Sequence, residues 1–209
     1  GVARANAAIF EQASTHAANH GMGTTLTALF VDGDVAFVAH VGDSRAYLVR
    51  DGNLLRLTAD HTWVADRVRE GVLSRDEARG HRWRNVITNA LGSGASFRLD
   101  VSHHVLRQDD RLLLLTDGVT TQLTEGRIAD LLRGRSAKEA VSALLDAADA
   151  RGSPDNVSAV VAIAGTVREG DRRLGHVLAE THVTSVDVGP GLRGVRSLEA
   201  RYPASSPLR

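Results

Sequence analysis

Two aspartates occupy positions from which a protein can hold a metal ion. Asp117 closely follows the apolar run Leu112–Leu115 and directly precedes Gly118, while Asp155 stands just before the apolar stretch Val157–Ala164. If both stretches are buried strands, each carboxylate lies at a strand end, and converging carboxylate oxygens are the ligands that Mg²⁺ and Mn²⁺ favour. Each aspartate taken alone is equally typical of a turn, because Asp-Gly and Pro-Asp-Asn are common turn sequences.

The segments that would position these aspartates have the patterns of short strands. Asp32-Gly33 and Asp51-Gly52 are hairpin turn signals within the first quarter of the chain. Around them, strands are predicted at Thr24–Val31, Val35–Val41, Arg45–Val49 and Leu54–Leu57. Four strands with short connections predict an antiparallel sheet. Further strands are predicted at Phe97–Leu106, Asp110–Thr116 and Val157–Ala164.

Helices are predicted between these strands. The chain opens with an alanine-rich helical pattern from Ala5 to about Ala18. Ser74 with Glu77, and Ser136 with Glu139, have the spacing of capping boxes, so one short helix should begin near residue 75 and a longer one should run to about residue 150. The order of helix, sheet, helices, sheet, helix and strand predicts an α+β fold in which helices pack on antiparallel sheets.

Composition restricts the class of protein. The 209 residues suffice for one domain, and 43% of them are apolar, which is enough for a core. Equal numbers of basic and acidic residues (25 each) argue against a nucleic-acid-binding protein. No apolar run approaches the roughly 18 residues of a membrane span, and no signal peptide is visible. The lack of cysteine excludes disulfides and thiolate sites, and we expect a cytoplasmic protein.

Six motifs stand in a fixed order along the chain. They are Gly21–Thr25, Val41–Tyr47, Leu57–His61, Asn85–Gly92, Leu114–Val119 and Asp155–Ser158. This ordered set resembles the metal-dependent protein phosphatase family (PPM, type 2C), in particular its bacterial serine/threonine phosphatase branch. The resemblance covers about residues 1–165, and it implies an antiparallel β-sandwich flanked by helices in four layers (αββα).

The resemblance also implies roles for individual residues. Asp117 and Asp155 match the two aspartates that coordinate the second metal of a binuclear Mn²⁺ or Mg²⁺ centre. Asp60 matches an aspartate that helps to hold a third ion, although an acid at this position is also typical of a solvated turn. Asp43, Ser44 and Arg45 match a structural motif for which we expect a buried hydrogen-bonding role rather than catalysis. Gly21 and Gly23 are expected to permit a tight entry into the first strand rather than to contact phosphate.

The implied activity is metal-dependent hydrolysis of phosphoserine and phosphothreonine in proteins. In this mechanism two metals share a bridging water, lower its pKa and direct it at phosphorus, so that no covalent enzyme intermediate forms. The implied partners are phosphoproteins, among them a bacterial serine/threonine kinase.

Residues 62–91 correspond to the flap beside the active site in bacterial relatives. This segment carries basic and aromatic residues, namely Trp63, Arg67, Arg69, Arg82, Trp83 and Arg84. Two interpretations are open: a surface that favours a phosphopeptide, or a solvated helical hairpin that its tryptophans anchor. For His81 we expect a capping or packing role.

The sequence departs from the family pattern at its beginning. Relatives open with strands that carry a phosphate-binding arginine and a metal-bridging aspartate, whereas the only acid among residues 1–20 is Glu11. His16 and His20 match no family motif and are expected at the surface. We therefore expect residues 1–165 to be a catalytic domain without its N-terminal strands, and this chain alone to have little activity. Residues 166–209 are expected to form an extension or a linker.

Two alternatives stand beside this hypothesis. One is a non-catalytic relative that keeps the fold as a regulatory or phosphoprotein-binding module, which the retained Asp117 and Asp155 argue against. The other is a phosphatase of the sporulation-regulator type, which shares fold and metals but acts on a small regulatory protein. The Gly-Asp-Ser-Arg sequence at residues 42–45 and the flap favour the broader serine/threonine branch.

Overall fold

The computed structural model describes residues 1–165, 178–189 and 192–200. The chain divides into two compact units. One unit contains residues 1–28, 39–44 and 58–101, and the other contains residues 29–38 and 45–57 and the described residues from 102 onward. We call them the first and the second unit.

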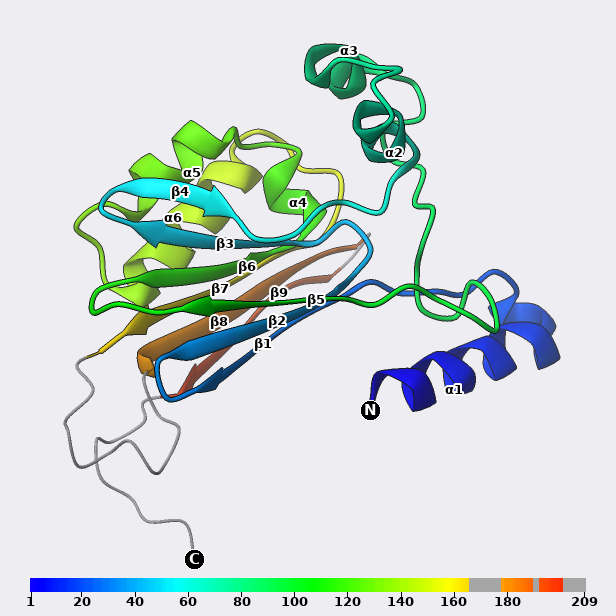
Figure 1. The fold of residues 1–209 in the computed structure, drawn as a ribbon, viewed down its shortest axis with the longest axis horizontal. Helices are drawn as coiled ribbons and strands as arrows, with labels where there is room; N and C mark the ends of the chain where they lie inside the picture. The colour runs from blue at the N-terminus through cyan, green and yellow to red at the C-terminus, as the bar shows by residue number, and fades with distance from the viewer. Residues whose placement is uncertain (166–177, 190–191, 201–209) are drawn as a thin grey trace, which may run out of the picture. The chain divides into compact units, whose positions relative to one another are not determined.

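The second unit is built on a six-stranded sheet in which neighbouring strands are antiparallel (Figure 1). Its strands, in the order β4-β3-β6-β7-β8-β9, are β4 (Asn53–Arg56), β3 (Arg45–Arg50), β6 (Arg111–Leu115), β7 (Val157–Ala164), β8 (Leu178–Gly189) and β9 (Leu192–Ala200). In β6, three of the five side chains are buried, as expected of a central strand that is covered on both faces.

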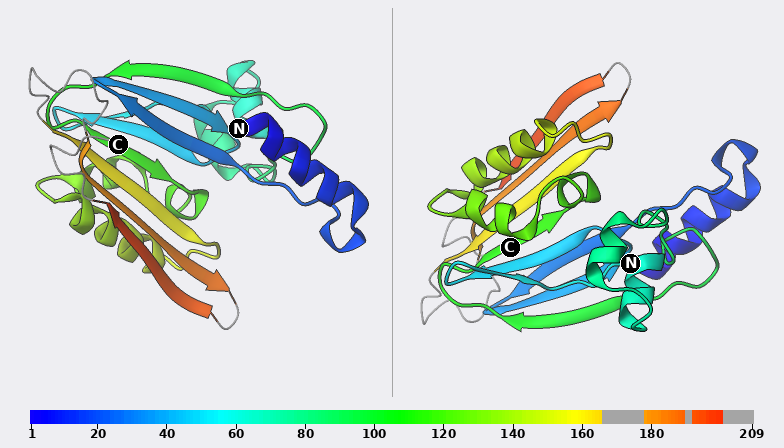
Figure 2. Two further views of the ribbon diagram at one scale, coloured as in Figure 1. Left: turned by 90° about the horizontal axis from the view of Figure 1, so that it is seen from below. Right: turned by 90° about the horizontal axis from the view of Figure 1, so that it is seen from above.

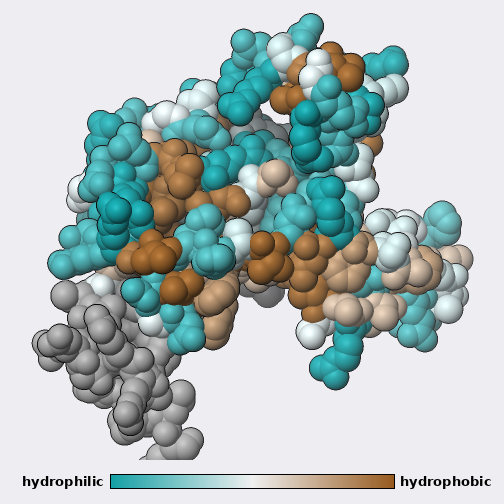
Figure 3. Space-filling view, viewed as in Figure 1, coloured by the Kyte–Doolittle hydropathy of each residue, from teal (hydrophilic) through white to brown (hydrophobic). Residues whose placement is uncertain are grey.

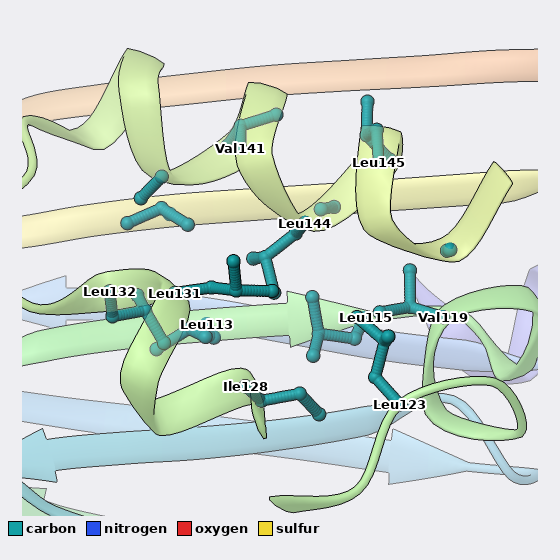
Figure 4. Close-up of a cluster of buried hydrophobic side chains, with 14 of the residues drawn as sticks. Leu113, Leu115, Val119, Leu123, Ile128, Leu131, Leu132, Val141, Leu144 and Leu145 are labelled. Carbon is teal, nitrogen blue, oxygen red and sulfur yellow. The ribbon is translucent and has the colours of Figure 1, made fainter. Parts of the chain in front are cut away.

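Helices cover one face of this sheet, as the turned views in Figure 2 show. They are α4 (Asp117–Thr120), α5 (Glu125–Leu132) and α6 (Ala137–Asp149). Val141, Leu144, Leu145 and Ala148 of α6 are buried at the i, i+3, i+4 and i+7 spacing of one helix face. Figure 4 shows how leucines of β6 pack among apolar side chains from all three helices to form the main core.

The opposite face of the large sheet packs against part of a smaller sheet. The smaller sheet has the order β1-β2-β5, with β1 (Leu26–Asp32), β2 (Val35–Val41) and β5 (Asp100–Val105). Within the second unit, Ala36 and Leu106 join Leu48, Leu112 and Ala162 in a second buried cluster. The expected α+β class, with two antiparallel sheets and flanking helices, is thereby confirmed.

The prediction of a single sheet from the first four strands was wrong. β1 and β2 belong to the smaller sheet, whereas β3 and β4 belong to the larger one. The chain leaves β2 at Gly42, which has a φ of 109°. A Cβ atom at Gly42 would overlap the side chain of Thr25, so only glycine permits the turn that redirects the chain.

The first unit contains helices and loops. Its helices are α1 (Val2–Thr15), α2 (Trp63–Arg69), α3 (Arg75–Gly80) and the short 3₁₀ helix η1 (Ala17–Asn19). Both predicted capping boxes are confirmed: Ser74 and Glu77 begin α3, and Ser136 and Glu139 begin α6 in the second unit. Hydrophilic side chains cover most of the visible surface of α2 and α3 in Figure 3, with a small hydrophobic patch among them.

Beyond residue 165 the structure has two strands that the sequence patterns did not predict. β8 pairs with β7, and β9 pairs with β8, in antiparallel register. The predicted break at Gly189-Pro190-Gly191 coincides with the end of β8. Residues 166–177, 190–191 and 201–209, which include much of the expected linker, lie outside the described residues. None of the helices in the described part of the chain is long and apolar enough to cross a membrane.

Candidate metal-binding edge and the buried histidine network

Asp117 lies where β6 meets α4. β6 ends at Leu115, Thr116 is the N-cap residue of α4, and Asp117 is the first helical residue. The Thr116 N–H donates to the carbonyl of Ser158 at 3.1 Å, which joins the end of β6 to the beginning of β7. Asp117 is therefore half-buried at the edge of the sheet, where the sequence predicts a carboxylate.

Asp155 lies in the loop that leads into β7 and is exposed. Each of the two aspartates accepts a hydrogen bond from the residue that follows it: the Gly118 N–H reaches Asp117 Oδ1 at 2.9 Å, and the Asn156 N–H reaches Asp155 Oδ1 at 2.7 Å. A Cβ atom at Gly118 would overlap the carbonyl of Asn156. The missing side chain at Gly118 thus lets the two turns approach each other closely.

The electrostatics of this edge suit a cation. Burial raises the pKa of the Asp117 carboxyl, and the charge of Asp155 raises it further, while the Gly118 N–H and Arg45 act in the opposite direction. A carboxylate whose ionised form is disfavoured by burial and by a neighbouring negative charge is stabilised when a divalent cation binds beside it. Oxygen donors of this kind fit Mn²⁺ or Mg²⁺.

The edge supplies two carboxylates. In the part of the chain that the structure describes, no group of three or more His, Cys, Asp or Glu side chains is placed to hold a metal. The close approach of Gly118 to the Asn156 carbonyl brings the turns of Asp117 and Asp155 together. Asp60 belongs to the first unit and is half-buried. We call Asp117, Asp155 and the turns that carry them the carboxylate edge.

The residue that follows Asp60 belongs to a buried polar network. His61 has a side chain without solvent exposure, and its Nδ1 receives the Gly42 N–H at 3.1 Å and the Asn89 Nδ2 at 2.7 Å. Because these groups can only donate, Nδ1 is an acceptor, and the proton of the neutral ring is on Nε2. Nε2 donates to Asp100 Oδ2 at 3.0 Å.

Asp100 carries the charge of this network. Partial burial opposes its ionisation, but the hydrogen bond from His61 and the charge of Arg98 hold the pKa of Asp100 below its ordinary value. Asn89 is oriented by Arg98, whose N–H donates to Asn89 Oδ1 at 2.9 Å. The network therefore fixes the orientation of His61 through backbone and side-chain contacts.

A second buried histidine completes the network. The His40 ring lies with its centroid 4.9 Å from that of His61. Its Nε2 donates to the carbonyl of Ala59 at 3.1 Å, and its Nδ1 lies 2.9 Å from Thr27 Oγ1. Burial lowers the pKa of His40, and the neighbouring His61 lowers it further. We call His40, His61, Asp100 and Asn89 the histidine network.

The sequence motifs Leu57–His61 and Asn85–Gly92 include His61 and Asn89, but sequence patterns assigned no role to any of the four network residues. His40 lies in the otherwise apolar strand β2 and His61 directly follows Asp60. A histidine within a run of buried residues is a signal for a polar network, because a buried polar group is nearly always hydrogen-bonded. The partners, however, come from positions 13 to 39 residues away.

In the flap segment, the aromatic residues pack on each other. Trp63 stacks on His81 with ring centroids 4.9 Å apart, and Trp83 meets Trp63 edge-on at 4.7 Å. His81 Nδ1 also accepts the Trp83 N–H at 3.1 Å, so the expected packing role of His81 is confirmed. Arg82 lies over the Trp83 ring, 4.6 Å from its centroid. These contacts lie within the flap itself and Trp83 is exposed, so they support a self-packed helical hairpin and do not show that the tryptophans anchor it to the core.

The remaining sequence-predicted positions have structural surroundings. Ser44 Oγ lies 3.1 Å from Thr25 Oγ1, and the Ser44 carbonyl accepts from Thr27, which agrees with the expected hydrogen-bonding role of Ser44. Residues 43–45 are half-buried, however, and not buried as expected. His16 and His20 are exposed, as predicted.

Sequence comparison gives the same family as the motifs. The family described as Protein phosphatase 2C matches residues 2–162. The chain is 38% identical over 157 residues to the serine/threonine protein phosphatase PstP of Mycobacterium tuberculosis, which is 75% of this chain and 30% of that protein. It is 32% identical over 152 residues to a serine/threonine phosphatase of Listeria welshimeri, covering 72% of this chain and 60% of that protein. The chain thus spans about a third to three fifths of these relatives.

Solved structures agree with the fold. The crystal structure of M. tuberculosis PstP superimposes with a TM-score of 0.73 at 36% identity, covering 77% of this chain and 68% of that one. The catalytic domain of PstP in complex with two manganese ions matches with a TM-score of 0.67 at 35% identity, covering 75% and 64% of the two chains. The matched family, the identities and the shared fold agree, and the chain belongs to the protein phosphatase 2C family.

Proposed function

We propose that this chain forms part of a metal-dependent phosphatase that hydrolyses phosphoserine and phosphothreonine in proteins. The observation that carries the proposal is the carboxylate edge, where Asp117 and Asp155 are held together although they repel each other. The relatives PstP and the Listeria enzyme are serine/threonine phosphatases, and a solved PstP domain contains two manganese ions. Substrates by this proposal are phosphoproteins, including a serine/threonine kinase of the same cell.

Asp117 and Asp155 would hold a divalent cation, Mn²⁺ or Mg²⁺, through their carboxylate oxygens. A cation bound there would supply Lewis-acid stabilisation of phosphate charge and an activated water. The chain's own contribution is to hold the turns of Asp117 and Asp155 next to each other, with the Gly118 N–H bonded to Asp117 Oδ1 at 2.9 Å. Arg45 acts on the same carboxylate, because its charge favours the ionised form of Asp117.

Asp60 is proposed as a ligand for a further ion. Its neighbours on both sides are fixed, since His40 donates to the carbonyl of Ala59 at 3.1 Å and the His61 N–H donates to Gly42 O at 2.8 Å. A carboxylate between two immobilised residues loses little additional freedom when it binds an ion. Residues 1–165 are proposed as the catalytic-domain part of the chain, and residues 166–209 as an extension.

Activity requires more ligands than the edge supplies, because a two-metal site holds its ions roughly 3.5–4 Å apart with bridging groups. We therefore compare two proteins in a Mn²⁺-dependent assay of phosphate release from a phosphothreonine peptide. One is the 209-residue chain, and the other is the same chain fused behind the N-terminal metal-binding segment of PstP. We expect little turnover by the chain and turnover at least about a hundredfold higher by the fusion.

Two variants of the fusion test the assignment. Asp117→Asn should abolish the Mn²⁺-dependent turnover, whereas Asp146→Asn, which changes an exposed aspartate of α6, should leave it unchanged. A fusion that folds and binds Mn²⁺ but releases no phosphate would favour the non-catalytic alternative. Full activity of the Asp117→Asn fusion would contradict the proposed metal site.

A further inference from the structure

Ser153 is a buried polar residue in the loop between α6 and β7. Its side chain is only 8% exposed, and none of the roles considered so far uses it. Its Oγ lies 3.1 Å from the carbonyl oxygen of Gly118 and 3.2 Å from the carbonyl oxygen of Asp155. One hydroxyl therefore contacts the two turns that carry Asp117 and Asp155.

The carbonyl of Gly118 depends on this hydroxyl. In a continuing helix it would accept the N–H of residue 122, but the Gln122 N–H donates to Val119 instead, at 3.1 Å. Gly118 is buried, so its carbonyl needs a partner from within the protein. Ser153 supplies that partner from a position 35 residues away in the sequence.

The Asp117 and Asp155 turns need hydrogen bonds that hold them together, because their carboxylates repel each other. On the strand side, Thr116 Oγ1 accepts the Ser158 N–H at 3.0 Å and ties β6 to β7. On the helix side, the corresponding contact is the Ser153 hydroxyl. Without it, the loop would still be tied by Arg151, which donates to the Gln122 carbonyl at 3.0 Å, and by Thr116 Oγ1, 3.4 Å from the Asn156 carbonyl. Neither of these contacts reaches the Gly118 carbonyl, so a shift of Asp155 away from α4 would be less restrained and would relieve the repulsion.

We propose that Ser153 is a positioning residue that holds the Asp117 and Asp155 turns at the separation needed to bind one divalent cation. The proposal rests on the proposed metal site and adds a residue that touches neither the ion nor the substrate. Groups that orient metal ligands commonly change metal affinity by about 10- to 100-fold when they are removed.

The test measures Mn²⁺ binding to the 209-residue chain by the loss of the free Mn²⁺ signal in electron paramagnetic resonance, together with the melting temperature. Ser153→Ala removes the hydroxyl, and Ser153→Thr keeps it. The matched control is Ser136→Ala, which also removes a serine hydroxyl, here one that accepts the Glu139 N–H and donates to the Glu139 carboxylate at the start of α6. Asp117→Asn serves as the reference for loss of the site itself.

We expect the Mn²⁺ dissociation constant to rise about tenfold in Ser153→Ala and less than about threefold in Ser153→Thr. Ser153→Ala and Ser136→Ala should both lower the melting temperature by a few degrees, but Ser136→Ala should leave the Mn²⁺ dissociation constant within about twofold of its original value. This result would separate positioning from general stability.

Three results would count against the proposal, and each has a different meaning. If Asp117→Asn weakens Mn²⁺ binding but Ser153→Ala does not, Ser153 is only structural and the metal site stands. If Asp117→Asn itself has no effect on Mn²⁺ binding, the metal site is wrong, and the role of Ser153 is removed with it. Equal weakening in Ser153→Ala and Ser136→Ala would also count against positioning, because the effect would then follow stability alone.

Discussion

The carboxylate edge and the histidine network are both clusters of ionisable side chains, but they are built in opposite ways. In the network, each nitrogen of His61 has a partner of the right kind, and the one carboxylate, Asp100, lies next to donors. At the edge, the negative charge of Asp155 acts on the Asp117 carboxylate, and burial and this like charge raise the pKa of Asp117. A network in which every polar group has a hydrogen-bond partner stabilises the fold. A cluster of like charges is instead suited to binding an oppositely charged ligand.

This contrast gives opposite signs for substitutions in the two regions. A change in the histidine network should cost stability and leave Mn²⁺ binding by the edge largely intact. A change of a carboxylate at the edge should cost Mn²⁺ binding and increase stability.

His61→Ala should destabilise the chain by about 4 kcal/mol, because it opens a cavity and leaves the buried Gly42 N–H without its acceptor. Urea unfolding followed by circular dichroism measures this loss. His103→Ala, at an exposed position of β5, should change the free energy of unfolding by less than about 0.5 kcal/mol. Equal effects of the two substitutions would show that the network contributes nothing special.

Gly118→Ala should destabilise the chain by about 3 kcal/mol, because the added methyl group would overlap the Asn156 carbonyl and force the turns apart. It should also weaken Mn²⁺ binding, unlike His61→Ala measured in its folded range. Gly126→Ala is the control, since a Cβ atom there meets nothing within 4 Å. A stable Gly118→Ala variant that binds Mn²⁺ normally would contradict the close approach of the turns.

The histidine network should make stability depend on pH. Burial and the neighbouring His61 lower the pKa of His40, so the unfolded chain binds a proton more readily than the folded chain does. The free energy of unfolding should therefore fall as the pH drops below about 6.5, the ordinary pKa of histidine. His40→Gln should remove up to about 1.4 kcal/mol per pH unit from that slope. An unchanged slope, measured by urea unfolding from pH 5 to 8, would contradict the assignment.

At the edge the sign is reversed. Because the pKa of Asp117 is raised in the folded chain, its ionised form costs stability at all pH values above that pKa. Without metal at pH 7.5, Asp117→Asn should therefore stabilise the chain by about 1 kcal/mol. Saturating Mn²⁺ should raise the melting temperature of the unaltered chain and not that of the variant. Destabilisation by Asp117→Asn in metal-free buffer would contradict the opposed charges.

Local sequence signals predicted much of the fold. The strands Val35–Val41 and Val157–Ala164 have the predicted bounds, and both capping boxes are present. Helices α4 and α5 were not predicted, because four and eight residues give little periodicity. The assignment of β1 and β3 to different sheets was missed as well, since pairing partners are set by long-range contacts and not by the turns between neighbours.

The candidate site divides in the same way. The positions of Asp117 and Asp155 at strand ends follow from local patterns, since an apolar run adjoins each of them. Ser153 and His40 could not be found in this way, because a serine or histidine gains its importance only from partners distant in sequence. Gly118 lies between these cases: its place after Asp117 suggested a turn, but the carbonyl that it accommodates comes from another loop.

The third strand of the small sheet, β5, follows β2 only after a long connecting segment of the chain. β4 ends at Arg56 and β5, which pairs with β2, begins at Asp100, with α2, α3 and the Gly71 turn between them. The entropic cost of closing such a loop grows slowly, by about 0.6 kcal/mol for each doubling of its length. Insertions at the exposed Gly71 should therefore hardly affect whether the chain folds, so the turn between α2 and α3 can take up added length without loss of the sheet.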